Sequence, residues 1–510
     1  MTNERIIKTN IDASMQQNLE EMALNAKSAL HPSTSLAMLV VDHTDMSVKA
    51  YVGSIDFNDE SRFGHVDMVN AVRSPGSTLK PFVYALAIDE GLIHSESLLQ
   101  DTPRIYGYAP ENFNTAFSGA VSASDALGKS LNLPAVQLLE SYGAKKFMAK
   151  LSNADINLKL PPYSEPNLAV ILGGAGISLD QLVSAYSAFA RGGKISPLRY
   201  LESDPLVEYD FTDAGAAWIT RRMLSGEADP AFYRRGFLSF AYKTGTSYGM
   251  RDAWAVGISS KYIIGVWVGR PDGTPVPEQF GAATAVPFLY QINNYLKSRQ
   301  TNSFLLNDYL DEKPESVSVK NICWPSGQTL DDGDTNCRVE KRAWIFNGLT
   351  PPTLFSSEQD LAGGWFTYYV NDKNERVAYY CKNAVQKKLA LWPVSLTPWL
   401  PKEERPEARL PKKSLSCPPL EENDPTRTLI IKNVKNDTIF TLKNGELIPK
   451  INSQGGRGTR WWFLNGELIA QNRENELLNY RFTKEGKFQL VVIDESGQSD
   501  KSEFIVKEIR

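Results

Sequence analysis

Three short motifs, each occurring once in this 510-residue chain, constrain its fold more than any other feature of the sequence. In chain order they are Ser77-Thr-Leu-Lys80, Ser130-Leu-Asn132 and Lys243-Thr-Gly245. A hydroxyl, an amine and an amide can act on one substrate only if the fold brings them to one cleft. The chain must therefore fold so that segments far apart in sequence converge.

The first motif stands where a helix is expected to begin, after Pro75-Gly76 and before an apolar stretch that ends at Gly91. Positions i and i+3 on a helix are neighbours, so the Lys80 amine can approach the Ser77 hydroxyl. Lysine can take the serine proton only if desolvation or a nearby cation lowers its pKa. This pattern predicts a serine nucleophile beside its base. The alternative is an exposed helix that happens to carry one serine and one lysine.

The second motif lies at the break between two helical runs, just before Pro134. A hydroxyl and an amide two residues apart can both face a cleft, where Ser130 would relay a proton and Asn132 would hold a substrate carbonyl or amide. The alternative is a helix cap, because serine and asparagine are common at such positions.

The third motif ends a strand-like stretch. Gly245 within a strand indicates a place where another backbone comes close. Lys243 supplies positive charge, and Thr244 and Thr246 supply hydroxyls, a combination that suits a substrate carboxylate. The alternative is a strand that simply ends in a turn.

The hydrophobic pattern predicts an α/β (α+β) fold in which helices pack on an antiparallel sheet. An amphipathic helix within residues 1–30 is expected to be a connector outside the core. The remaining expected elements are strands at 35–42, 48–53, 238–244, 253–258 and 262–268, and helices at 78–90, 122–140, 144–152, 179–191 and 213–225.

Residues 301–425 are expected to form a connector with little regular structure, because seven prolines fall between Pro398 and Pro425. Residues 426–510 read as a small β-sandwich, with hairpin signals at Asn444-Gly445 and Asn465-Gly466. Trp461 and Trp462 fall on opposite faces of one strand. We expect both to be packing residues, and the alternative is that one is exposed and binds glycan or a partner.

Composition excludes several classes of function. Fifty-five basic against 59 acidic residues give a net charge of -4 with the signs mixed, so nucleic acid is not expected as a partner. The sequence shows neither a signal peptide nor an apolar run long enough to span a membrane.

The four cysteines favour disulfides Cys323–Cys337, across the turn at 331–336, and Cys381–Cys417 in an exported protein. Four free thiols are the alternative, and a cation held at 331–334 is less favoured than a turn.

Taken together, the three motifs are the signature of penicillin-binding proteins and class A β-lactamases. The chain resembles the transpeptidase half of class A penicillin-binding proteins, most closely the 1C type. The resemblance covers nearly the whole chain. It is carried by the segments 35–42, Arg73-Ser-Pro-Gly-Ser-Thr-Leu-Lys-Pro-Phe-Val-Tyr84, 130–136, 171–176, Lys243-Thr-Gly-Thr-Ser-Tyr-Gly249, 269–273, Ile322-Cys-Trp-Pro325 and Arg460-Trp-Trp-Phe-Leu-Asn-Gly466.

The resemblance implies a linker remnant at 1–30, a transpeptidase domain at 31–300, the connector at 301–425 and a C-terminal domain at 426–510. It implies that Ser77, Lys80 and Ser130 are catalytic. It also implies that Asn132 and the stretch Lys243–Thr246, including Gly245, bind the substrate. The backbone N–H groups of Ser77 and Thr246 would form the oxyanion hole.

The implied substrates are peptidoglycan stem peptides ending in D-Ala-D-Ala, and β-lactams would acylate the same serine. No metal or organic cofactor is required. Location is expected at the periplasmic face of a bacterial inner membrane. Because this chain begins at what resembles the family's linker, glycan polymerisation is not expected of it. A glycosyltransferase domain or other cell-wall synthesis proteins are candidate partners.

Two other functions stay open. A DD-carboxypeptidase or β-lactamase would pass the acyl group to water, and Glu165 in Glu165-Pro-Asn-Leu168 could be the carboxylate that activates that water. A binding module that senses β-lactam or peptidoglycan without turnover is the second alternative.

Overall fold

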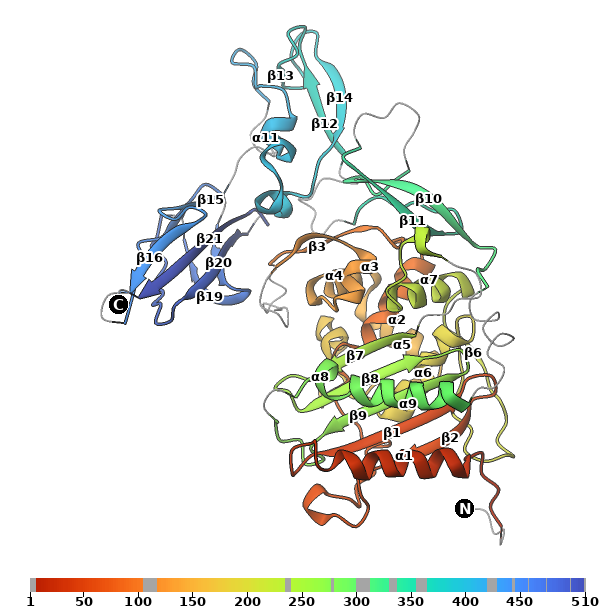
Figure 1. The fold of residues 1–510 in the computed structure, drawn as a ribbon. Helices are drawn as coiled ribbons and strands as arrows, with labels where there is room; N and C mark the ends of the chain where they lie inside the picture. Colours follow the sequence, from red (N-terminus) through yellow and green to blue (C-terminus); the bar gives the residue numbers. More distant parts are fainter. Residues whose placement is uncertain are drawn as a thin grey trace.

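The computed structural model of the chain describes most of the residues (Figure 1). These are residues 6–103, 117–233, 240–276, 279–299, 312–329, 337–354, 365–419, 429–442, 445–456, 458–473, 475–495 and 497–508. The turns expected at 331–336 and at Asn444 lie outside them, as does the start of the strand expected at 238–244. No helix among the described residues is long and apolar enough to cross a membrane.

A five-stranded antiparallel sheet forms the centre of the first half of the chain. Its strand order is β2-β1-β9-β8-β7, so the hairpin expected at its edge is present. The strands are β1 (Ser35–Asp42), β2 (Ser47–Val52), β7 (Ala241–Thr246), β8 (Asp252–Ile258) and β9 (Tyr262–Gly269). All eight residues of β1 are buried, because both faces of the sheet are covered.

One face of the sheet packs against α1 (Ala13–Ala26) and α9 (Val286–Arg299), which follows the short α8 (Gly281–Thr284) (Figure 1). The expectation that the first helix is a connector outside the core was wrong. Met15, Leu19 and Ala26 are buried against alternate residues of β1. Asp12 caps this helix by accepting a hydrogen bond from the Met15 N–H.

The other face carries a helical layer whose members agree with the expected helices. They are α2 (Lys80–Asp89), α3 (Ala123–Gly128), α4 (Asn132–Tyr142), α5 (Ala144–Asn153), α6 (Leu179–Ala190) and α7 (Ala214–Leu224). Ala37, Leu39 and Val41 of β1 join this second core. A short hairpin of β3 (Leu98–Asp101) and β4 (Gly119–Ser122) lies at its end. The fold is thus the expected antiparallel sheet with helices.

The connector contains more regular structure than expected. Its strands are β10 (Val317–Trp324) paired with β11 (Val339–Phe346), and β12 (Trp365–Val370) between β13 (Arg376–Val377) and β14 (Val385–Ala390). The prediction of an irregular connector was therefore wrong for these segments. The proline-rich part does form only short turns, η6 (Val394–Trp399), η7 (Lys402–Glu404) and α11 (Pro406–Arg409).

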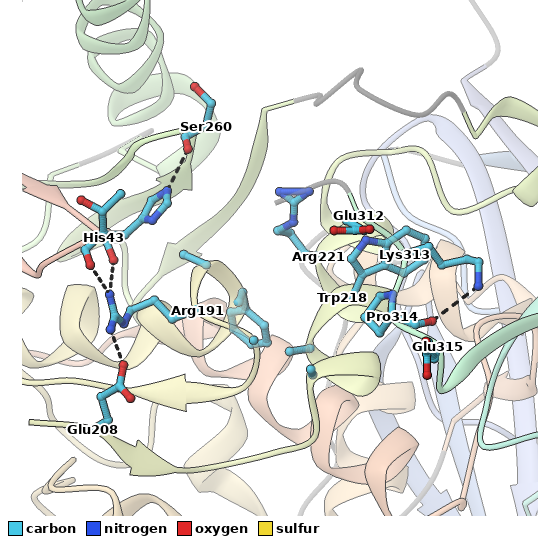
Figure 2. Close-up of a pocket in the computed structure, with 16 residues that line it drawn as sticks. His43, Arg191, Glu208, Trp218, Arg221, Ser260, Glu312, Lys313, Pro314 and Glu315 are labelled. Carbon is cyan, nitrogen blue, oxygen red and sulfur yellow. Dashed lines mark hydrogen bonds and ion pairs between the residues drawn. The ribbon is translucent and has the colours of Figure 1, made fainter. Parts of the chain in front are cut away.

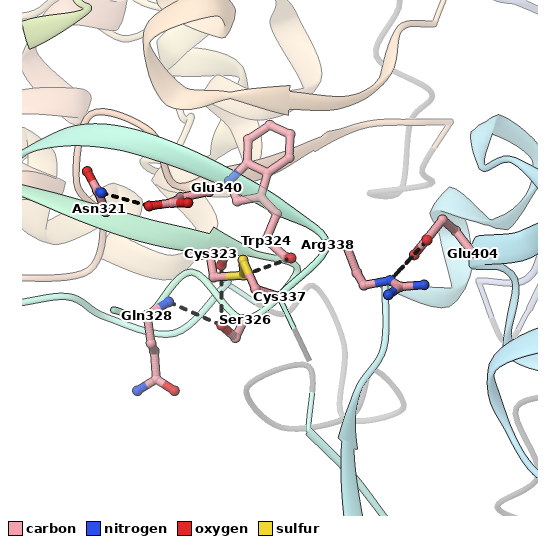
Figure 3. Close-up of a disulfide and its surroundings, with 9 residues drawn as sticks. All are labelled: Asn321, Cys323, Trp324, Ser326, Gln328, Cys337, Arg338, Glu340 and Glu404. Carbon is pink, nitrogen blue, oxygen red and sulfur yellow. Dashed lines mark hydrogen bonds and ion pairs between the residues drawn. A yellow bond between two sulfur atoms is a disulfide. The ribbon is translucent and has the colours of Figure 1, made fainter. Parts of the chain in front are cut away.

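The cysteines pair as favoured from the sequence, Cys323 with Cys337 and Cys381 with Cys417. The first disulfide joins the two chain segments at the loop end of the β10–β11 hairpin, and Figure 3 shows it beside Trp324 and Ser326. The second joins the β12–β14 region to the chain that leaves α11.

The C-terminal region is a five-stranded sheet of order β16-β21-β20-β18-β19, covered on one face by a two-stranded sheet of β15 and β17. Its strands are β15 (Ile430–Lys432), β16 (Thr438–Leu442), β17 (Asn452–Gln454), β18 (Arg460–Leu464), β19 (Glu467–Asn472), β20 (Gly486–Asp494) and β21 (Ser499–Glu508). The hairpin signal Asn465-Gly466 joins β18 to β19. Trp462 is fully buried between the two sheets, and Trp461 packs on the opposite face. The domain limits at 30, 300 and 425 remain predictions.

Candidate active site

Ser77 lies in a one-turn 3-10 helix, η2 (Gly76–Leu79), that runs directly into α2. Pro81 in the first turn of α2 suits a helix start because its missing N–H would have no partner there. Lys80 and eight of the nine following residues of α2 are buried, so the helix is fixed within the core. The half-buried Ser77 is thereby presented at the end of a rigid element, as the first motif predicted.

Two glycines let the Ser77 turn lie directly against β7. Gly76 has a φ of +54°, and a Cβ there would lie 2.3 Å from the Thr246 carbonyl oxygen. A Cβ on Gly245 would lie 2.2 Å from the Pro75 carbonyl oxygen. The third motif therefore contains glycine for the reason expected from the sequence, the close approach of another backbone.

Lys80 is completely buried and binds the second motif. Its Nζ donates hydrogen bonds to the Ser130 carbonyl oxygen at 2.7 Å, the Leu131 carbonyl oxygen at 3.0 Å and Asn132 Oδ1 at 2.5 Å. Burial, together with the nearby Lys243 charge, holds the pKa of Lys80 well below its ordinary value. The expected lowering of the pKa is therefore present. The hydrogen bonds of the amine, however, go to the second motif and not to the Ser77 hydroxyl.

Ser130 and Asn132 bind the two buried lysines and do not act as a helix cap. Ser130 has a φ of +57°, and Asn132 is the first residue of α4, where the cap position is taken by Leu131 without a side-chain hydrogen bond. The Asn132 amide oxygen binds Lys80, and Ser130 Oγ accepts a hydrogen bond from Lys243. The left-handed conformation at Ser130 turns the chain so that both side chains point toward the lysines.

Lys243 joins the second motif to the third. Its Nζ donates to Ser130 Oγ at 2.7 Å and to the Thr244 carbonyl oxygen at 2.9 Å. Burial lowers the pKa of Lys243 to about 7. Three motifs that are far apart in sequence are thus linked by two buried lysines.

The threonines of the third motif lie on the other side of β7, toward α8. Thr246 Oγ1 accepts a hydrogen bond from the Gly281 N–H at 3.0 Å, and Thr244 lies close to the same glycine. A hydroxyl that accepts one bond still has its proton to donate. Neither threonine hydroxyl has a hydrogen bond to Lys243.

A buried ion pair that the sequence did not reveal supports this arrangement. Arg73 Nε lies 2.8 Å from Asp252 Oδ1, and Asp252 also accepts hydrogen bonds from Ser247 and Trp267. Arg73 precedes the Ser77 turn, and Asp252 starts the strand paired with β7. In the sequence, Arg73 stands out only as part of the segment 73–84. Nothing there indicates that it pairs with Asp252, which lies far along the chain.

Two hollows lie in the described part of the chain near these elements. One, of about 380 Å³, adjoins the site and is lined by Arg73, Ser74, Ser247 and Tyr248, among others. A larger one, of about 840 Å³, lies between His43, Arg191 and Glu208 on one side and Trp218, Arg221 and Lys313 on the other (Figure 2). None of the residues predicted for the site lines the larger hollow, so it is not the cleft of the three motifs.

The carboxylate considered for water activation is on the surface. The Glu165 side chain is 81% exposed and forms an ion pair with Lys145, which is also exposed. Glu165 therefore lacks the buried position that a catalytic base beside Ser77 would occupy. Among the described residues, no cluster of three or more acidic, histidine or cysteine side chains could hold a metal ion.

The fold and the three joined motifs define the class of penicillin-binding proteins. The chain belongs to the penicillin-binding protein transpeptidase domain family, whose model matches residues 36–294. The penicillin-binding protein 1C linker domain matches 316–345, its second linker domain matches 359–408, and the penicillin-binding protein C-terminus family matches 418–505.

Curated relatives agree with these matches. Penicillin-binding protein 1C of Escherichia coli is 50% identical over 98% of this chain and 65% of its own length. Penicillin-binding protein 1F of Bacillus subtilis is 29% identical over 52% of this chain and 39% of its own. The chain thus spans less than two thirds of the length of these relatives.

Solved structures show the same fold. Penicillin-binding protein 1A of Haemophilus influenzae has a TM-score of 0.52, with 18% identity, over 64% of this chain and 55% of that chain. PonA1 of Mycobacterium tuberculosis in complex with penicillin V has a TM-score of 0.50, with 20% identity, over 58% of this chain and 87% of that chain.

Proposed function

We propose that the chain is a serine-type D-Ala-D-Ala transpeptidase that cross-links peptidoglycan stem peptides through a Ser77 acyl-enzyme and is acylated by β-lactams at the same residue. The observation that carries this proposal is the linkage of all three motifs by the buried amines of Lys80 and Lys243 beside the Ser77 turn. An exposed helix, a helix cap and a strand end would not produce that linkage.

In the first half-reaction, Lys80 takes the proton of the Ser77 hydroxyl. A lysine with three hydrogen-bond acceptors is held as an ammonium, so Lys80 must release one acceptor before its lone pair can serve as the base. Its lowered pKa makes the neutral amine more accessible than that of an ordinary lysine. Ser77 Oγ then attacks the carbonyl carbon of the penultimate D-Ala.

The backbone N–H groups of Ser77 and Thr246 would hold the negative charge of the tetrahedral intermediate, a role that the close approach of Gly76 to Thr246 supports. As an ammonium, Lys243 can only donate to Ser130 Oγ, so Ser130 can pass its own proton to the leaving amine of the terminal D-Ala and take up the proton that Lys80 removed from Ser77. Asn132 would hold the donor peptide. Lys243, Thr244 and Thr246 would provide positive charge and hydroxyls for its carboxylate.

In the second half-reaction, an amine from a neighbouring stem attacks the acyl-enzyme and releases Ser77. We propose the periplasmic face of a bacterial inner membrane as the location, where this substrate is found. A glycosyltransferase domain or another cell-wall synthesis protein is proposed as the partner that supplies glycan. Hydrolysis by the same acyl-enzyme is the second candidate, since water can replace the acceptor amine.

The experiment is labelling with a fluorescent penicillin, followed by intact mass and peptide mapping. Wild type is expected to carry one stable adduct on the peptide that contains Ser77, and Ser77→Ala is expected to carry none. Ser298→Ala, on the surface of α9, is the matched control and should label like wild type. A folded wild-type protein without an adduct would contradict the proposal.

A second measurement separates transfer from hydrolysis. The protein is incubated with a D-Ala-D-Ala donor peptide, with and without an acceptor amine, and the products are resolved by mass. A cross-linked product whose yield rises with the acceptor supports transpeptidation. Exclusive release of the shortened donor, or rapid turnover of penicillin, supports hydrolysis.

A further inference from the structure

The C-terminal sheet touches the helical layer next to the candidate site. Phe463 of β18 and Val491 and Ile493 of β20 form a buried apolar cluster with Phe117 and Leu133. Each of these five side chains is at most 5% exposed. The cluster lies on the face of the C-terminal sheet opposite the face that buries Trp462. The sheet therefore has two cores, its own and one shared with the transpeptidase domain.

Leu133 directly follows Asn132 in the first turn of α4. Lys80 binds the Ser130–Asn132 segment from one direction, through three hydrogen bonds. The C-terminal sheet contacts the same turn of α4 through Leu133. The segment is also held by backbone hydrogen bonds to α3 and by Lys243, which binds Ser130 Oγ. The contact at Leu133 adds a support from the C-terminal sheet.

The C-terminal sheet and the connector pack against the β3–β4 hairpin through defined contacts. The rings of Phe117 and Phe463 lie edge to face, with centroids 5.9 Å apart. Trp399, at the end of η6, donates from its indole Nε1 to the Phe117 carbonyl oxygen at 3.2 Å. Gly119 has a φ of +77°, and a Cβ there would lie 2.5 Å from the Trp399 ring. The β3–β4 hairpin thus meets the connector at close packing distance, with no room for a side chain.

Hydrogen bonds continue the contact between the three regions. Ser499 of β21 donates to the Ser395 carbonyl oxygen at 2.7 Å, and the Ser395 hydroxyl donates to Gln100 of β3. Lys501 lies over the Trp399 ring, 5.3 Å from its centroid. The C-terminal sheet, η6 and the β3–β4 hairpin therefore form one continuous interface that ends at Leu133.

We propose that the C-terminal sheet is a positioning element of the acyl-transfer site, and that Phe463, through Phe117 and Leu133, sets the position of Ser130 and Asn132. This inference rests on the proposed function. Phe463 does not touch the reacting atoms. It acts through α4, because a shift of the first turn of α4 moves the hydroxyl that relays the proton and the amide that binds Lys80.

Two phenylalanines of the same sheet provide a matched test. Phe463 is 1% exposed and faces Phe117, whereas Phe504 is fully buried and faces the sheet's own core. Truncation of either one to alanine leaves a cavity of similar size. Of the two, only Phe463→Ala removes a side chain from the cluster that contains Leu133. Phe463→Leu keeps apolar packing at the same place and serves as the conservative variant.

The measurement is the rate of acylation of the full chain by a fluorescent penicillin under saturating conditions, beside a thermal unfolding curve for each variant. Phe463→Ala is expected to slow acylation about tenfold, which corresponds to a displacement of a fraction of an ångström at Ser130. Phe504→Ala is expected to lower the unfolding temperature but to stay within about twofold of the wild-type rate, since distant sites act independently. Phe463→Leu is expected to recover most of the rate.

If Phe463→Ala does not fold, Val491→Ala is tested in its place, because it removes less volume from the same cluster. Val491→Ala is also expected to slow acylation of Ser77. A wild-type rate in the interface variants overturns the inference and leaves the proposed function intact. Equal slowing in Phe504→Ala also overturns it, because general destabilisation would then be the cause. A wild-type protein that is not acylated at Ser77 contradicts the proposed function, and the inference falls with it.

Discussion

Replacement of Gly76 by alanine tests whether the Ser77 turn and β7 must lie in direct contact. The added Cβ would lie 2.3 to 2.7 Å from three backbone atoms of Thr246. Ordinary contacts begin at 3.4 Å, so the two segments must separate by about 1 Å. No flexible side chain can move aside, because every close atom belongs to the backbone.

This separation has a cost in stability and a larger cost in rate. Alanine at positive φ costs roughly 1 to 2 kcal/mol, and the overpacking adds roughly 1 to 3 kcal/mol. A misplacement of about 1 Å at a reacting centre lowers the rate about 100-fold. We therefore expect Gly76→Ala to lower the unfolding free energy by roughly 2 to 5 kcal/mol and to slow Ser77 acylation about 100-fold.

Gly226 offers a control that isolates the backbone conformation. It has a φ of +76°, and a Cβ there meets nothing within 4 Å. Gly226→Ala should show the conformational cost alone and acylate like wild type. Acylation is measured with a fluorescent penicillin, and stability by thermal or denaturant unfolding. If Gly76→Ala is acylated at the wild-type rate, the close approach of the Ser77 turn to β7 is not needed for acylation, which refutes the role assigned to Gly76.

Three further predictions concern the supports of the site. Arg73→Ala leaves Asp252 buried without its cation. The unfolding free energy should therefore fall by about 3 to 5 kcal/mol, and penicillin labelling should slow. Unchanged stability in a denaturant titration would contradict the role of the pair. Because burial lowers the pKa of Lys243 from 10.5 to about 7, the unfolded chain binds more protons between these values and stability rises with pH across that window. Lys243→Met should flatten this rise, and an unchanged slope would refute the assignment. Reduction of Cys381–Cys417, at a sequence separation of 36, should lower stability by roughly 3 to 4 kcal/mol; calorimetry with and without reductant checks it, and an unmoved transition would count against it.

Local features of the site could be predicted from the sequence. The start of α2 at the first motif and the break at Ser130 follow from glycine, proline and hydrophobic pattern. The strand expected to end at the third motif instead continues through it to Thr246. Gly245 correctly indicated close backbone approach. These predictions succeed because each depends on a few neighbouring residues.

Features that depend on a distant partner could not be predicted. The apolar residues along one side of α1 are visible in the sequence. The sheet face that they cover is made of alternate residues of β1 and β9, so nothing in the sequence indicated it and the helix was taken for a connector. Buried and exposed residues hardly alternate along β12 and β14, so neither strand stood out in the sequence. The prolines that follow them favoured an irregular connector instead. The Arg73–Asp252 pair and the apolar cluster that holds Phe463 and Leu133 join residues that nothing in the sequence links to each other.

The pairing of β1 with β9 has a consequence for the synthesis of the chain. Val40 and its neighbours in β1 are completely buried only when β9 lies beside them, and Asp42 pairs with Tyr262, far along the chain. At ribosomal rates of about 5 to 20 residues per second, the partner strand follows after roughly 10 to 45 seconds. During that interval β2 can pair with one edge of β1, but the edge that later pairs with β9 has no partner, and an exposed edge of an apolar strand promotes aggregation. The yield of folded protein should therefore depend on how the nascent chain is protected during this interval.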